Sequence, residues 1–202
     1  MDSVFDVVAT IVHSNPSIEY LTLVRYIGGK NWGDRAQTPE AGKFEWSRTG
    51  MKQDRGERVL TKLSREEVSP ESLHELAKSL SEDKLLGILS KVSLLNEEAA
   101  HIPMMDFKCA TSPENLETLR SLLKDLRLGR GFLLESGRSY HYYGIKLLDE
   151  KEWQVFLGRC LLMSGYSDDR YIGHQLVDGY CVLRLSSGRW KKTPPTVAAE
   201  LL

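Results

Sequence analysis

The clearest fold signal in the sequence is a leucine-striped helix between two short apolar runs. Ser112 followed by Pro113 is a typical helix start, and leucines then recur at helical spacing as far as Leu126. The apolar runs on either side, at 101–108 and 131–136, have the length of buried strands. Helices that alternate with strands are typical of α/β and α+β domains, so we predict a sheet with helices packed against it.

The rest of the second half continues this pattern. A Ser-Gly-Arg turn at 136–138 leads into an alternating strand at 139–146, and an acidic helix start follows at Asp149. Two further strand candidates lie at 170–172 and 179–186. The order β-α-β-β-α-β-β predicts a mixed sheet backed by helices on one face, with parallel strands where a helix connects them.

The first half has a different character. We expect two regions, with residues 1–100 mostly helical and residues 101–202 forming the α/β core. Many glycines and charges at 28–57 predict a long surface loop, which also contains Trp32 and Trp46. The expected helices of the first half cover residues 4–12, 17–25, 69–80 and 81–95.

Composition limits the function classes. The 202 residues are 41% hydrophobic, and 27 basic and 28 acidic side chains leave a net charge of −1. No overall positive field indicates a nucleic-acid binder, so such binding would need a local basic groove. No apolar run approaches the ~20 residues that span a bilayer, and the acidic start differs from a signal peptide. We therefore expect a soluble, cytoplasmic protein that does not bind membranes.

Asp106 is the first candidate for chemistry. It ends an apolar strand, which is a rigid place to present a carboxylate, and strand alternation puts Lys108 on the same side. The alternative is a surface acid that ends the strand and pairs with a neighbour.

The segment from Ser136 to His141 is the second candidate. Gly137 relieves the turn, whose amides can point at an anion, and Arg138 adds a donor fork suited to phosphate. Ser139 and His141 share one face of the following strand and can meet one ligand. The alternative is a hairpin with an exposed polar face.

The third group lies near the C-terminus. Asp168 and Asp169 are adjacent acids that can ligate a metal, and Arg170 follows them. Arg184 is a charged residue inside an apolar strand, where it either pairs structurally or contacts phosphate. The alternative for 168–170 is a loop of solvated charges.

Taken in this order, the segments from Pro103 to Pro195 resemble the archaeo-eukaryotic primase superfamily, which includes primase-polymerases. That family has an acidic motif at a strand end, then a helix, a Ser-x-His motif and a third acid on a later strand. The resemblance implies an RRM-like primase-type core that binds a nucleoside triphosphate and DNA or RNA. It implies Mg²⁺ or Mn²⁺ held by catalytic Asp106 and by Asp169 or Asp168, nucleotide phosphates bound by Ser136, Arg138, Ser139 and His141, and nucleic-acid or phosphate contacts from Lys108, Arg170 and Arg184.

Lys108 departs from the family pattern, because it stands where the first motif has its second acid. A lysine at that position repels a cation, so three hypotheses follow. The first is a metal-dependent nucleotidyltransferase of the primase-polymerase type, with Asp106 and the third acid as its only metal ligands. The second is an inactive module on the same fold that binds nucleic acid or a nucleotide. The third is a protein-interaction domain whose partner binds the N-terminal half, with the segment of Trp32 and Trp46 as the contact surface.

Overall fold

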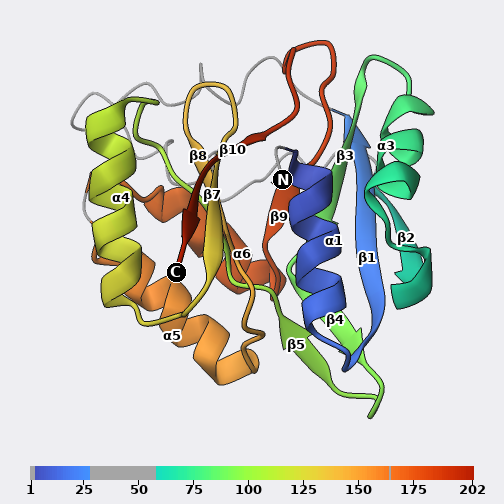
Figure 1. Ribbon diagram of the computed structural model, residues 1–202, viewed down its shortest axis with the longest axis horizontal. Coiled ribbons are helices and arrows are strands. Elements are labelled where there is room, and N and C mark those ends of the chain that lie inside the picture. The colour runs from blue at the N-terminus through green and yellow to red at the C-terminus, as the bar shows by residue number, and fades with distance from the viewer. Residues whose placement is uncertain (1–2, 28–57, 164) are drawn as a thin grey trace, which may run out of the picture.

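The computed structural model describes residues 3–27, 58–163 and 165–202, and in these residues the chain forms two antiparallel sheets (Figure 1). The predicted loop at 28–57 lies outside the described residues. The larger sheet has the order β5-β4-β1-β3-β9, and β2 pairs with β1. Its strands are β1 Ile18–Ile27, β2 Arg58–Ser64, β3 Lys84–Leu89, β4 Lys91–Leu94, β5 Ala99–His101 and β9 Val182–Arg184.

The smaller sheet has the order β10-β7-β8-β6. Helix α4 (Pro113–Asp125) connects β6 to β7, and these two strands point the same way, but β8 lies between them. The expected parallel neighbours are therefore wrong, because every strand pairing in the described residues is antiparallel. The strands are β6 Met104–Asp106, β7 Gly131–Glu135, β8 Tyr140–Gly144 and β10 Thr196–Leu201, of which β10 was not expected.

The predicted helix starts are confirmed in both halves. Ser112 precedes α4, and its hydroxyl accepts a hydrogen bond from the amide of Asn115 at 3.1 Å, which satisfies one of the free amides of the first turn. Ser69 and Asp149 cap their helices in the same way. The helices besides α4 are α1 Val4–Ser14, α3 Pro70–Lys78, α5 Glu150–Leu161 and α6 Asp169–Asp178, with a 3₁₀ turn at Arg65–Glu67.

The helix expected at 17–25 is wrong, since these residues form most of β1. The segment is rich in Ile, Tyr, Thr and Val, which favour strands. β1 pairs with β2 on one side and with β3 and β4 on the other, so backbone pairing within the sheet outweighs the helical spacing of Ile18 and Leu21.

The helix expected at 81–95 is also wrong, since it forms β3 and β4. Five consecutive residues of β3 are buried, so the strand has no polar face from which a period of two could be read. Gly87 allows a close crossing here, because a Cβ at this position would lie 3.1 Å from both the Leu183 carbonyl oxygen and the Tyr26 ring.

The two halves of the chain share one core. β9, from the C-terminal half, pairs with β3 and contacts β6 of the smaller sheet. Buried side chains from Val4 to Leu185 form a continuous cluster, while α4 and α5 lie beside the smaller sheet and α1 and α3 beside the larger one (Figure 1). The α+β fold class is therefore confirmed. None of the described helices is long and apolar enough to cross a membrane.

Candidate functional site

Asp106 and His141 face each other across neighbouring strands. Asp106 ends β6 and is the register partner of His141 in β8, and its Oδ1 atom lies 3.7 Å from His141 Nε2. The imidazole side chain is 6% exposed, whereas that of Asp106 is 42% exposed. This pairing brings together the two motifs that the sequence presents 35 residues apart.

The Ser136–Ser139 turn adjoins this pair. Gly137 adopts a φ of 108°, which is the left-handed region that favours glycine. The Ser136 amide donates to the Ser139 carbonyl at 2.9 Å, and the two hydroxyl oxygens lie 3.2 Å apart. The Ser139 hydroxyl lies close enough to the Asp106 carboxyl group to lower its pKa slightly. The turn therefore places a hydroxyl at the carboxylate, while Arg138 stands exposed at its tip.

Arg184 clamps this turn to the C-terminal segment. Its guanidinium donates to the carbonyls of Ser136 at 2.7 Å, Ser186 at 2.7 Å and Thr193 at 2.8 Å. The side chain is 6% exposed, so these bonds replace the water it loses. The sequence left open whether Arg184 has a structural partner or contacts phosphate. In the structure its guanidinium group bonds to three backbone carbonyls. Its charge still acts on both Asp106 and His141.

The pKa values of the facing pair move in opposite directions. Partial loss of contact with water raises the pKa of Asp106 to about 7, although the nearby Lys191 and Arg184 oppose this shift. Burial lowers the pKa of His141 to about 3, and the same two cations add to that shift. At pH 7 the imidazole is therefore neutral and the carboxyl group is about half protonated.

Lys191 is a site residue that sequence reasoning missed. It lies between β9 and β10, where its backbone bridges to Gly188, and its charge acts on Asp106, Arg184 and Arg138. The available signal was the basic run from Arg189 to Lys192 just after an apolar strand. With Lys191, the site has more positive than negative groups.

Two buried polar atoms at the site have no hydrogen-bond partner in the described part of the chain. They are Nδ1 of His141 and the Tyr143 hydroxyl, and the two rings lie 6.5 Å apart on the same face of β8. Tyr26 from β1 lies near enough for Arg184 and Asp106 to act on its pKa, which burial raises to about 12. Unpaired buried groups are costly, and Tyr143 itself is fully buried.

The third predicted group lies in a different setting. Residues 170–172 belong to α6 rather than to a strand. Asp168 is the N-cap of this helix and accepts the amides of Arg170 at 3.0 Å and Tyr171 at 3.1 Å. Its charge nevertheless acts on Asp106. Asp169 and Arg170 are exposed in the first turn.

Lys108 is also exposed, just beyond β6. The lysine whose charge acts on Asp106 is Lys191.

The implied Mg²⁺ or Mn²⁺ ion would need further oxygen ligands beside Asp106. Within residues 3–27, 58–163 and 165–202, no three His, Cys, Asp or Glu side chains are grouped so that they could hold a metal ion. The charges that act on Asp106 include two cations, Lys191 and Arg184, which repel a metal. The donor set of the described residues does not fit a two-metal site.

A second polar cluster has the composition of a hydrolase triad. Ser90 Oγ lies 3.2 Å from His101 Nδ1, and His101 Nε2 lies 3.1 Å from Glu150 Oε2. However, Ser90 is fully buried and its hydroxyl already accepts the Cys181 amide at 2.8 Å. No substrate can reach this hydroxyl, so the cluster is a structural connection.

The fold and the facing Asp106 and His141 define a primase-type α+β core. A family model for archaeo-eukaryotic primase 1D-like proteins (AEP-like) matches residues 64–196, about two thirds of the chain. The chain therefore belongs to the archaeo-eukaryotic primase 1D-like family. The match begins well before Pro103, so it includes strands of the larger sheet that the sequence resemblance did not cover. No curated protein and no solved structure matches the chain.

Proposed function

We propose that this chain is a primase-fold module that binds the phosphates of a nucleoside triphosphate, with nucleic acid beside it, and that needs no metal ion to do so. Family membership supports nucleotide and nucleic-acid partners as a class. The observation that carries the proposal is the state of His141. Its imidazole is buried and neutral, and its Nδ1 has no partner in the described residues. The nearby charges of Lys191 and Arg184 help to keep it neutral.

The surrounding groups suit a polyphosphate. The Ser139 hydroxyl can donate to a phosphate oxygen, and Arg138 and Lys191 supply charge. A carboxyl group with a pKa of about 7 is partly neutral, so it repels phosphate less than an ordinary aspartate would. These residues bind and orient an anion.

A single-metal nucleotidyltransferase is the second candidate function. It is favoured by one observation, the electrostatic proximity of Asp168 to Asp106. One carboxylate oxygen of Asp106 and one of Asp168 would then share a cation, and Asp168 would no longer cap α6. Recognition of a protein partner through Trp32 and Trp46 stays a prediction, because both lie outside the described residues.

Calorimetry with a nucleoside triphosphate, in EDTA and in Mn²⁺, tests the proposal. We expect binding in EDTA, and we expect His141→Ala to weaken it by about tenfold or more, because a hydrogen bond to a charged group is lost. Asp106→Ala should bind at least as tightly as the wild type. His13→Ala is the matched control, because His13 is exposed at the end of α1.

The outcomes separate the candidates. Binding that requires Mn²⁺ and disappears in Asp106→Ala would favour the single-metal enzyme and justify a primer-extension assay. Absence of binding under both conditions contradicts nucleotide recognition.

A further inference from the structure

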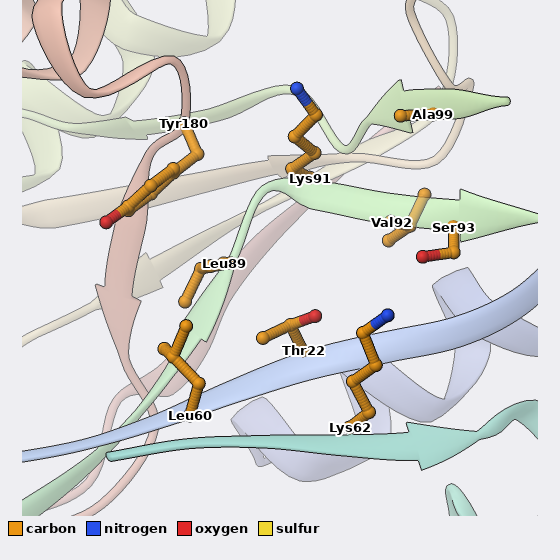
Figure 2. Close-up of a pocket in the computed structure, with 9 residues that line it drawn as sticks. All are labelled: Thr22, Leu60, Lys62, Leu89, Lys91, Val92, Ser93, Ala99 and Tyr180. Carbon is orange, nitrogen blue, oxygen red and sulfur yellow. The ribbon is translucent and has the colours of Figure 1, made fainter. Parts of the chain in front are cut away.

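A hollow of about 460 Å³ lies on the larger sheet, on the face turned away from α1 (Figure 2). Its floor is apolar and includes Leu60 from β2 and Leu89 from β3, the strands on either side of β1, with the Tyr180 ring at one edge. Leu60 is 56% exposed, which is unusual for a leucine on a sheet whose other face is core. The floor of the hollow is thus an apolar surface that is open to a ligand.

The opposite edge of the hollow is polar and positively charged. Lys62 pairs with Thr22 across β1 and β2, and Figure 2 shows its ammonium group directed toward the middle of the hollow, near the hydroxyls of Thr22 and Ser93. One cation flanked by two hydroxyl donors is suited to a single anionic group.

Basic residues alternate with an apolar residue along β2. Arg58, Leu60 and Lys62 pair with Tyr26, Val24 and Thr22 and therefore lie on the same face of the sheet. β2, β3 and β9 contain no acidic residue. A row of cations with an apolar surface between them matches a polyanion that carries flat rings, and it matches a protein surface less well.

The hollow lies on the face of the larger sheet that also carries Arg184, which adjoins the Asp106–His141 site. Along the β3–β9 ladder, Leu89 pairs with Val182 and Gly87 pairs with Arg184. Two residues of a strand span about 7 Å, so the floor of the hollow lies one short step from the buried Arg184. A chain-like ligand that reaches the site can therefore extend into the hollow.

We infer that this hollow holds one nucleotide of a single-stranded nucleic acid whose backbone continues toward the Asp106–His141 site. The inference rests on the proposed function. The base packs on Leu60 and against the Tyr180 ring, and a phosphate binds the Lys62 ammonium. These contacts require only a ring face and a phosphate, so the binding does not depend on sequence.

Fluorescence anisotropy with a labelled oligothymidylate at several salt concentrations tests this inference. We expect Lys62→Glu to weaken binding by about tenfold or more and to reduce the salt slope by about one. Lys62→Gln should weaken it in the same direction, and Lys62→Arg should keep it. Lys78→Gln on α3 is the matched control, since Lys78 is 62% exposed and pairs with Glu75.

His141→Ala separates this inference from the proposed function. This variant should lose nucleotide binding and keep oligonucleotide affinity within a few-fold of the wild type. Oligonucleotide affinity that is unchanged in both Lys62→Glu and Lys62→Gln would overturn the hollow as the binding place, even if nucleotide binding stands. Failure of the wild type to bind the oligonucleotide overturns it as well. Lys62-dependent oligonucleotide binding without nucleotide binding would support the hollow and reject the proposed function.

Discussion

Asp106 is the residue whose protonation decides the charge of the site. Its carboxyl group is the acid that directly faces His141, and partial loss of contact with water raises its pKa to about 7. Lys191 and Arg184 are the basic residues beside it, and burial lowers the pKa of both. The net charge of the site therefore becomes more positive as Asp106 takes up a proton.

This gives a pH prediction for nucleotide binding without metal. Below pH 7 Asp106 is neutral, and above pH 7 its carboxylate repels phosphate, so affinity should fall as pH rises through about 7. Asp106→Asn should remove this dependence between pH 6 and 8. Calorimetry in EDTA across that range measures it. In a metal-bridged site the sign reverses, because ionised Asp106 would then hold the cation, and a rise in affinity with pH would contradict the metal-free site.

At the scale of secondary-structure elements, the start of helix α4 is tied to β8, the strand that carries His141. Its N-cap Ser112 also fixes the connecting loop, because the Ser112 amide and carbonyl both bond to the Tyr140 hydroxyl at 2.9 Å. Tyr140 is the residue before His141 and is buried. The start of α4 is thereby tied to β8 next to His141.

Ser112→Ala should lower the free energy of unfolding by about 1 kcal/mol, because the Asn115 amide loses its acceptor. Ser121→Ala is the matched control, since Ser121 is exposed within the same helix, where alanine is the better helix former. Urea unfolding of both variants measures the difference. Equal stability of the two variants would show that the cap contributes nothing.

At the scale of the whole molecule, the two sheets meet at β6 and β9, and the Ser90–His101–Glu150 cluster, whose Ser90 and His101 are buried, reinforces this junction. Because the Glu150 carboxylate can only accept, Nε2 carries the proton of the neutral His101 ring, and the Ser90 hydroxyl donates to Nδ1 while accepting the Cys181 amide. The Nε2 proton of His101 then points to Glu150, in the first turn of α5. The imidazole also stacks on Trp153 with ring centroids 4.4 Å apart.

His101→Ala should therefore lower the free energy of unfolding by about 2 to 4 kcal/mol, since it leaves a cavity and an unpaired Ser90 hydroxyl. Glu150→Gln is the matched comparison, because Glu150 is 51% exposed and an amide oxygen still accepts the His101 proton; it should cost less than about 1 kcal/mol. Chemical denaturation measures both. If His101→Ala were as stable as Glu150→Gln, the cluster would not stabilise the junction of the two sheets.

Local sequence signals were sufficient for the helices that begin after Ser69, Ser112 and Asp149, for the hairpin of β7 and β8, and for the strand positions of Asp106 and His141. Each depends on neighbouring residues alone, such as a hydroxyl before a helix or an alternation along a strand. The same signals also indicated the primase-type fold, which the family match confirms.

Tertiary structure alone decided the rest. β1 is a strand because β2 pairs with one of its edges and β3 and β4 pair with the other. β3 is buried on both faces, which hides its period in the sequence. Lys191 acts on Asp106 from 85 residues away along the chain, and the Arg184 donors bond to three carbonyls that no local pattern indicates. Spacing shows which side chains share a face, but charges and hydrogen-bond partners from distant segments become visible only when the chain is folded.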